Sequence, residues 1–297
     1  MHSYLRAIGF SKIESRKAFE DILNDVMESP TFKYTYEISP NHILVQFIKE
    51  FGDNIGISLV GEYDEKGKFF LNYYTPFASA QVASSKEPVM INKRVDTDAY
   101  TGMCDDMRLG ISLIFYLQNI IDYKKCSDKS ETKHPVDIYL SALSAEGKVL
   151  LGLSNEYTFS RKKILENHRK NKLIADAKNG NQEAIDALTM EELDTFAMVT
   201  RRSRTEDIYT LVEHSFIPFG SESDNYTLLG TILNWDTIKN DATGEEIYCL
   251  LINCNHLVFP VYINKNDLFG VPMIGRRFKG NVWMQGNMSS IFENVPK

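Results

Sequence analysis

Residues 275–286, GRRFKGNVWMQG, decide which fold the last third of this 297-residue chain can adopt. If the stretch is a β-strand, alternate side chains point to opposite faces. One face then carries Phe278, Gly280, Val282 and Met284, and the other carries Arg277, Lys279, Asn281, Trp283 and Gln285. The first face is apolar and predicts a strand that faces a core. Gly275, Gly280 and Gly286 predict sharp bends at or beside this strand.

Four further β-rich runs precede this stretch: DIYTLVEHSFIPF, YTLLGTILNW, EEIYCLLINC and LVFPVYI. Turn signals separate them, namely GSESDN, NDATGE and NKNDLFG. Short strands at this spacing, with glycines that allow bends, are typical of a small, partly closed barrel of the OB or SH3-like type. We therefore predict a C-terminal small β-barrel over residues 206–297.

Residues 159–205 predict an all-helical connector. SRKKILENHRKNKLIADAKNG is a basic helix that Asn179 and Gly180 would close, since this pair is common at helix C-termini. NQEAIDAL predicts a short second helix. A third is expected to begin at Thr189, because Glu192 follows at the spacing of a capping box.

Residues 1–158 predict an α+β domain with an antiparallel sheet and helices. SKIESRKAFEDILNDVMES has helical periodicity, and Ser11 and Glu14 stand at capping-box spacing. Short β-rich runs from residue 30 to about residue 95 predict an antiparallel meander. DMRLGISLIFYLQNIIDYKKC fits a buried helix or a buried strand, and its length favours a helix over the sheet. PVDIYLSALSAEGKVLLGLS predicts a hairpin that turns at Glu146 and Gly147. We expect the first and last parts of the chain to form separate β-containing cores.

Composition narrows the classes of function. A net charge of −7 argues against a nucleic-acid partner, because phosphate binding usually requires a basic surface. The first residues lack the apolar core of a signal peptide, and the longest apolar run is too short to span a bilayer. Four scattered cysteines predict free thiols in a reducing compartment. Together these observations predict a cytoplasmic protein that does not bind a membrane.

The basic face of residues 275–286 is the main candidate for ligand binding. Arg277 and Lys279 share this face with Trp283, and OB-type barrels hold anionic or stacked ligands with such side chains. Arg276, next to them in the sequence, is a further candidate binding residue. In the alternative interpretation, Trp283 packs against the helical connector and Arg277 pairs with its acidic residues. His214 is a further candidate binding residue, because its apolar neighbours indicate a buried strand.

Clustered carboxylates give the main candidate metal site, ahead of the possible zinc ligands Cys249, Cys254 and His256, of which only Cys254 and His256 share a strand face. Asp96, Asp98, Asp105 and Asp106 fall within a dozen residues, and carboxylate oxygens hold Mg²⁺ or Ca²⁺. Their spacing matches no EF-hand loop. In the alternative interpretation, Asp105 or Asp106 caps a following helix. The common hydrolase, zincin and nucleotide-binding motifs do not occur in the sequence, so we expect no cofactor.

Three segments carry a resemblance to a known family. They are GMCDDMRLGISLIFYLQN, DAKNGNQEAIDALTMEELDTFAMVTRRSRTEDIYTLVEHSFIPFG and YCLLINCNHLVFPVYINKNDLFGVPMIGRRFKGNVWMQG. They resemble a family of uncharacterised proteins from clostridial, Gram-positive anaerobes, classed as a domain of unknown function. The resemblance runs over nearly the whole chain. It implies a bacterial cytoplasmic protein of unassigned role and transfers no catalytic residues.

Two hypotheses for the function follow. The first is a non-catalytic protein that binds a ligand or another protein in a groove between the α+β domain and the barrel, because ligand sites favour such junctions. Its partner would be a protein or a small anionic ligand. The alternative is a metal-assisted hydrolase or phosphoryl-transfer enzyme that uses the carboxylates of residues 96–106.

Overall fold

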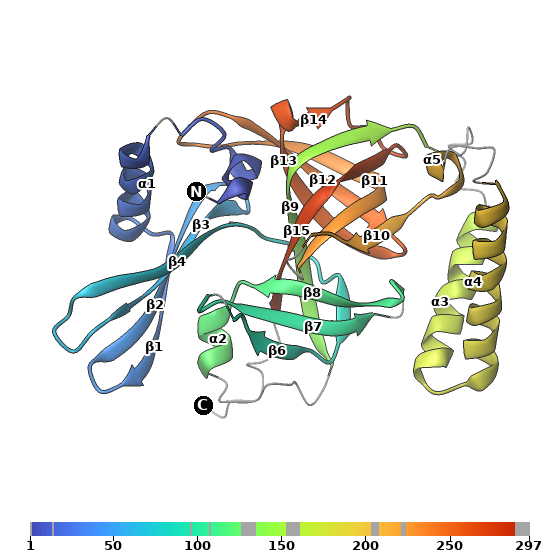
Figure 1. Cartoon of the computed structure of the whole chain (residues 1–297), viewed down its shortest axis with the longest axis horizontal. Helices are drawn as coiled ribbons and strands as arrows, with labels where there is room; N and C mark the ends of the chain where they lie inside the picture. The colour runs from blue at the N-terminus through green and yellow to red at the C-terminus, as the bar shows by residue number, and fades with distance from the viewer. Residues whose placement is uncertain are drawn as a thin grey trace.

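The computed structural model describes residues 2–13, 15–95, 97–106, 108–125, 135–152, 161–202, 208–220 and 224–288. A four-stranded sheet lies at one side of the molecule and an eleven-stranded sheet in the middle. Two long helices lie at the other side (Figure 1). The predicted mixture of sheets and helices is therefore confirmed.

The four-stranded sheet is an antiparallel meander, as predicted. Its strands are β1 (Phe32–Ser39), β2 (His42–Gly52), β3 (Ile55–Tyr63) and β4 (Phe69–Ala78), in that order. The short helix η1 (Ser3–Ile8) and the predicted helix α1 (Arg16–Glu28) come before it. Helix α1 begins one turn later than the capping-box spacing suggested. Its N-cap is Ser15, whose hydroxyl accepts a hydrogen bond from the Ala18 amide at 3.1 Å, whereas the Ser11 hydroxyl donates to Glu245.

The eleven-stranded sheet draws strands from both ends of the chain. From the first half come β5 (Ser85–Glu87), β6 (Met90–Lys93), β7 (Tyr100–Asp106), β8 (Ile111–Leu117) and β9 (Val136–Leu150). From the second half come β10 (Ser215–Pro218), β11 (Asn225–Lys239), β12 (Glu246–Cys254), β13 (Leu257–Asn264), β14 (Leu268–Phe269) and β15 (Arg277–Met288). The expectation of separate β cores is wrong, because β9 pairs with β13 and with β15.

Five of these strands pair in a cycle. Strand β11 pairs with β12, β12 with β13, β13 with β9, β9 with β15, and β15 again with β11. The fifth member is β9, which sequence patterns placed in the first domain. Phe278, Val282 and Met284 of β15 are fully buried, so the predicted core-facing side of this strand is confirmed.

Two predictions for the first half are corrected. Residues 136–150 form one strand and no hairpin. Gly147 is needed there for packing, because a Cβ at this position would lie 2.4 Å from the Phe278 ring. The predicted helix over residues 106–126 is strand β8 followed by the short helix α2 (Ile120–Lys125). Leu113, Phe115 and Leu117 are buried at every second position, which is the period of a strand.

Helices α3 (Arg161–Lys178) and α4 (Gln182–Arg202) form a hairpin, and α5 (Ile208–Leu211) is a single turn. Gly180 has a φ of 81° and ends α3 as predicted. Residues 182–202 are one helix and not two. Thr189 lies inside this helix, and its hydroxyl donates to the Ile185 carbonyl one turn earlier instead of capping a new helix. The predicted boundaries at residues 158 and 205 lie outside the described residues and stay a prediction.

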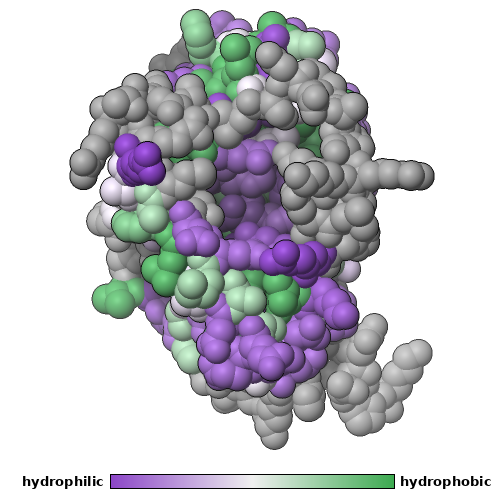
Figure 2. Space-filling view, turned by 90° about the vertical axis from the view of Figure 1, so that its right-hand side faces the viewer, coloured by the Kyte–Doolittle hydropathy of each residue, from purple (hydrophilic) through white to green (hydrophobic). Residues whose placement is uncertain are grey.

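The side of the molecule with α3 and α4 is hollowed, and hydrophilic residues line the hollow (Figure 2). A cavity of about 450 Å³ on this side has Arg108, Lys178 and His256 among its lining residues. Desolvation lowers the pKa of His256, and the charges of Lys170 and Arg108 lower it further. Within the described ranges, no helix is long and apolar enough to cross a membrane.

A shared apolar cluster holds the two sheets together. It includes Leu59 of the small sheet and Tyr116, Leu143 and Trp283 of the large sheet, all buried. Helices η1 and α1 contribute residues to the same cluster. The two sheets are therefore fixed against each other, and a cavity between them has stable walls.

Candidate ligand-binding site

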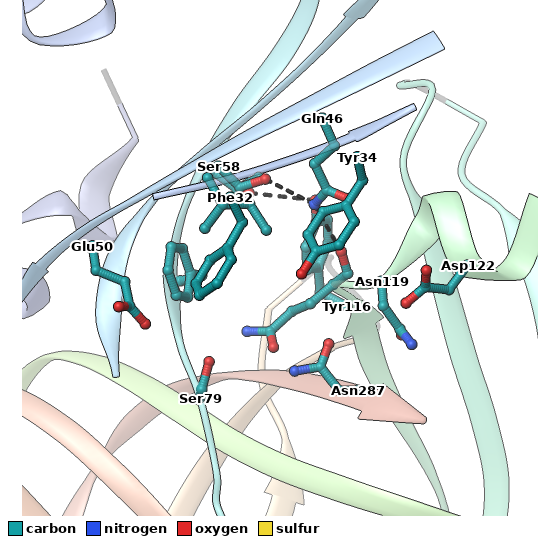
Figure 3. A pocket seen from close by; sticks show the side chains of 14 residues that line it. Phe32, Tyr34, Gln46, Glu50, Ser58, Ser79, Tyr116, Asn119, Asp122 and Asn287 are labelled. Atoms are coloured by element: carbon teal, nitrogen blue, oxygen red, sulfur yellow. Dashed lines mark hydrogen bonds between the residues drawn. The ribbon is translucent and has the colours of Figure 1, made fainter. Parts of the chain in front are cut away.

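A cavity of about 310 Å³ lies between the small sheet and one end of the large sheet (Figure 3). Strands β1 to β4 supply one wall, and β8, α2, the segment between them and the end of β15 supply the other. This volume is at the lower end of the range for ligand pockets, roughly 300–1,000 Å³. The cavity therefore fits a small molecule.

Aromatic side chains form the apolar part of the cavity. Phe32 and Tyr34 stand two residues apart on β1, so they project from the same face of this edge strand. Their rings stack with centroids 6.4 Å apart, and they are 46% and 39% exposed. Phe77 lines the cavity from β4 and is buried. Two large rings at the mouth of a cavity are thus open to contact with another molecule.

Two glutamine side chains line the inner wall, and their amide nitrogens already donate hydrogen bonds to protein groups. Gln46, which is 3% exposed, donates from Nε2 to the Ser58 hydroxyl at 2.9 Å and to the Gln118 carbonyl at 3.0 Å. Gln118 donates from Nε2 to the Ala78 carbonyl and to Gln285 Oε1, both at 2.7 Å. A backbone carbonyl only accepts, so these contacts fix which end of each amide is nitrogen. In the described part of the chain, Oε1 of Gln46 and Oε1 of Gln118 accept no hydrogen bond.

Carboxylates stand at both ends of the cavity, as Figure 3 shows for Glu50 and Asp122. Burial raises the pKa of Asp122, while a hydrogen bond with Asn119 and the charge of Lys125 lower it to a smaller extent. The pKa of Tyr34 is raised by burial and by the negative charge of Asp122. The Tyr34 hydroxyl and the Asp122 carboxylate therefore share one end of the site.

Tyr116 forms part of the inner wall. Its hydroxyl lies 3.4 Å from the Thr75 hydroxyl, and burial raises the pKa of Tyr116. The phenol thus stays protonated at neutral pH. The described lining includes two carboxylates and no lysine, arginine or histidine. The ionisable carboxylates of the lining therefore have no basic residue beside them in the lining itself.

The predicted basic face of β15 is placed elsewhere, and its tryptophan is covered. Trp283 is 3% exposed, and its ring lies against His2 and Tyr116, with centroids 4.7 Å and 5.1 Å apart. Its Nε1 donates to Asp224 at 3.0 Å. The prediction that this face presents an accessible ring is wrong, because the N-terminal segment packs on it. The alternative that Trp283 packs is correct, although the contact is not with the helical connector.

The basic residues of this strand contact protein groups. Arg277 is buried and donates to the backbone carbonyls of residues 151, 209 and 212, and burial lowers its pKa. Lys279 contacts the Tyr209 hydroxyl and lies 3.9 Å from the centroid of that ring. Arg276 donates to the Val271 carbonyl at 3.3 Å. Arg277 and Lys279 are therefore brought together around α5 and away from Trp283.

His214 bridges two strands. One ring nitrogen, Nε2, lies 3.0 Å from the Thr231 hydroxyl, and the other, Nδ1, accepts a hydrogen bond from the Asn255 amide at 3.3 Å. A ring nitrogen that accepts from an amide carries no proton, so this geometry fits the neutral imidazole. His214 thus ties the start of β10 to β11 and to the turn before β13.

The candidate metal ligands are dispersed. Asp96 lies outside the described residues. Asp98 pairs with Lys93 at 2.6 Å, and Asp105 accepts a hydrogen bond from the Ser112 hydroxyl at 2.6 Å. No group of three potential metal ligands occurs among the described residues. The alternative that Asp105 or Asp106 caps a helix is wrong, because β7 leads through a turn into β8.

Asp106 is a buried structural carboxylate. It accepts hydrogen bonds from the Arg108 guanidinium, the Arg108 amide and the Ser85 hydroxyl. Desolvation alone would raise the pKa of Asp106, but these hydrogen bonds and the charge of Arg108 outweigh it, so the pKa is lowered. Arg108 also donates to the carbonyls of Ser84 and His256. The pair therefore connects the turn after β7 with two other segments of the sheet.

The lowered pKa of Asp106 predicts a dependence of stability on pH. Because the carboxyl binds its proton more weakly in the folded state, its contribution is fully present above the unfolded value of about 3.9 and is lost as pH falls through the folded value. Asp106→Asn should therefore be less stable than the parent at neutral pH, by a margin that narrows below about pH 4. Urea denaturation across pH measures this margin. A constant margin would contradict the assignment.

Comparisons with known proteins identify one family. A family model described as "Domain of unknown function, E. rectale Gene description" (DUF3881) matches residues 5–286. No curated protein matches the chain, and no solved structure matches it. The matched range includes every residue of the cavity lining except Asn287.

Proposed function

The chain belongs to the DUF3881 family, as its resemblance to an uncharacterised family implied, and from this premise we propose that it is a non-catalytic protein that binds a small organic ligand. The ligand occupies the cavity between the two sheets. The observation that carries the proposal is the pairing of two exposed rings, Phe32 and Tyr34, with a deep wall of buried polar groups. Ligand sites typically combine apolar walls with a few convergent polar groups.

The chemistry of the lining supports binding and not turnover. Nucleophilic catalysis requires a hydroxyl or thiol within hydrogen-bond reach of a base. In the described lining, Ser58 accepts from the Gln46 amide, and Thr75 lies beside the protonated Tyr116. The carboxylates Glu50 and Asp122 stand at opposite ends. Among the described residues, neither hydroxyl therefore has a base as its hydrogen-bond partner.

We also propose a barrel and a cellular location for the protein. The cycle of β11, β12, β13, β9 and β15 supports the predicted small, partly closed barrel of the OB or SH3-like type. The free thiols Cys104, Cys249 and Cys254 support a reducing, cytoplasmic location. Fast hydrogen exchange of the β15 amides that pair with β9 or with β11 would exclude the barrel. Detection of the protein outside the cytoplasmic fraction of its native cell would exclude the location.

Replacing Tyr34 tests the site. Tyr34→Ala removes one exposed ring from the cavity mouth, and burying an aromatic ring against a ligand contributes roughly 1.5–3 kcal/mol. We expect at least about tenfold weaker binding of any compound that a thermal-shift screen of a metabolite library identifies. Such a compound raises the melting temperature of the parent protein by mass action.

Phe70→Ala is the matched control for this variant. Phe70 is 48% exposed on β4, the opposite edge of the same sheet, and does not line the cavity. Both variants should keep the parent's stability to within about 0.5 kcal/mol, because exposed side chains contribute little to folding. Equal binding by the two variants, or no stabilising compound in the library, would rule out the proposed function.

A further inference from the structure

We propose that the ligand of this cavity, whose existence rests on the function proposed above, is a small molecule that carries a primary ammonium group. The structure points to this class through three features: acceptor oxygens without donors, unbalanced negative charge, and aromatic rings beside the charge. Each feature favours a ligand that brings N–H donors and a positive charge.

The acceptor oxygens come from the two glutamines. Gln46 is almost completely buried, and its amide nitrogen is held by Ser58 and by a backbone carbonyl. Gln118 is held in the same way by Ala78 and Gln285. The remaining oxygens, Gln46 Oε1 and Gln118 Oε1, have no donor among the described residues, and both side chains line the cavity. Neither oxygen is enclosed away from water, so a ligand that donates to them exchanges hydrogen bonds to water for direct hydrogen bonds inside the cavity.

The charge of the site comes from Asp122 and Glu50. Asp122 is half-buried and forms no ion pair with a described cationic side chain; the effect of Lys125 on it is weaker than the effect of burial. The described lining adds Glu50 and no cationic side chain. An anionic ligand would meet repulsion from both ends of the cavity. A cation would compensate a carboxylate that forms no ion pair with the described residues.

The rings explain why the cation is organic and not a bare metal ion. Phe32, Tyr34 and Phe77 provide an apolar surface that a hydrated inorganic ion cannot use. A ring face also attracts an ammonium group within about 6 Å of its centroid. Tyr34 lies close enough to Asp122 for the carboxylate to raise the pKa of its hydroxyl, so ring and charge act on the same end of a ligand. A neutral polyol is the nearest alternative, because it also donates hydrogen bonds.

Four probes of similar shape separate these classes. Full-length protein is titrated by calorimetry or ligand-observed NMR at neutral pH with phenethylamine, 2-phenylethanol, phenylacetate and N,N,N-trimethylphenethylammonium. We expect phenethylamine to bind about tenfold or more tightly than the alcohol, because hydrogen bonds to charged groups are the stronger ones. Phenylacetate should bind most weakly. The quaternary ion should bind more weakly than phenethylamine, since it has the charge but no N–H donor.

Asp122→Asn tests which side chain recognises the charge. It should weaken phenethylamine binding about tenfold or more and change 2-phenylethanol binding less than threefold. Asp105→Asn is the control, because Asp105 is exposed on β7 and does not line the cavity. A melting curve checks folding. Since burial disfavours the charged form of Asp122, its neutral amide should not lower the melting temperature.

The outcomes distinguish this proposal from the proposed function. If the alcohol binds as tightly as the amine, and Tyr34→Ala weakens both, the cavity is a ligand site but the ammonium class is overturned. The same conclusion follows if Asp122→Asn leaves amine binding unchanged. If none of the four probes binds saturably at millimolar concentration, the ammonium proposal fails, whereas the proposed function fails only if the library screen also yields no stabilising compound. Tight amine binding that Asp122→Asn abolishes and Asp105→Asn preserves supports both.

Discussion

Asp224→Ala should lower the free energy of unfolding by about 3–5 kcal/mol, the usual cost of removing one partner from a buried ion pair. The Asp224 side chain is completely buried and accepts hydrogen bonds from the Arg94 guanidinium and from Trp283 Nε1, both at 3.0 Å. Arg94 is itself largely covered. The substitution leaves the Arg94 guanidinium without its carboxylate and the buried Trp283 indole without its hydrogen-bond acceptor. It also weakens the junction of the N-terminal segment with β15, since the Trp283 ring packs on His2 and Tyr4.

Urea denaturation followed by circular dichroism measures the change. Asp105→Ala is the control, because its carboxylate is exposed and receives one hydrogen bond, from Ser112. Exposed polar substitutions usually change stability by less than about 0.5 kcal/mol. Asp224→Asn separates charge from hydrogen bonding, because the amide retains an acceptor oxygen for Trp283. A loss below about 1 kcal/mol for Asp224→Ala would show that the carboxylate is not a structural centre.

Phe278→Ala should be comparably severe, with a loss of about 3–5 kcal/mol. The ring is fully buried on β15 and contacts two glycines: a Cβ on Gly147 would lie 2.4 Å from it, and a Cβ on Gly280 2.7 Å. Neighbouring backbone has therefore approached closely around this ring. Because a glycine has no side chain to move into the space, the cavity left by alanine cannot easily collapse.

Phe269→Ala is the control for Phe278, since Phe269 is 81% exposed on β14. Phe278→Leu should fall between the two, because it keeps most of the apolar volume. Denaturation curves of the three variants give the order of their stabilities, provided that their m-values are equal. If Phe278→Ala were as stable as Phe269→Ala, the buried ring of Phe278 would contribute no more to stability than an exposed one.

Strand β15 shows what could be predicted from sequence. Its alternation of apolar residues identified the buried face correctly, because side-chain period follows from backbone geometry alone. The opposite face was misjudged, since Trp283 and Gln285 are also buried there. Alternation shows that two faces differ, but it does not reveal which distant segment covers the second face. Here His2 and Tyr4 cover Trp283 from more than 270 positions away, and the end of β4 covers Gln285.

Strand β9 shows a second limit. Gly147 follows an acidic residue in the middle of an apolar run, and local rules then predict a turn. The residue is glycine for a non-local reason, the ring of Phe278. Only the pairing of β9 with β15 exposes that reason.

The cavity could not be located from sequence for the same reason. Its walls come from β1, β2, β3, β4, β8, α2 and the end of β15, and no two glutamines or carboxylates of the site form a local motif. One signal was present: FKYTYEI, residues 32–38, alternates Phe32 and Tyr34 on one face of a strand. Apolar rings that alternate on an edge strand indicate a surface in need of a partner. That signal does not say whether the partner is protein or ligand.

The order in which the chain leaves the ribosome has a consequence for strands β8, β9 and β11. All three pair with β15, whose residues 277–288 are synthesised long after β8 and β9. Until then, β9 has an open edge along most of its length, and such edges invite pairing with other chains. The small sheet pairs only sequential strands and can form early, whereas the large sheet cannot be completed until β15 has been synthesised. Newly made molecules therefore pass through a period in which one sheet is complete and the other is a template for misassembly.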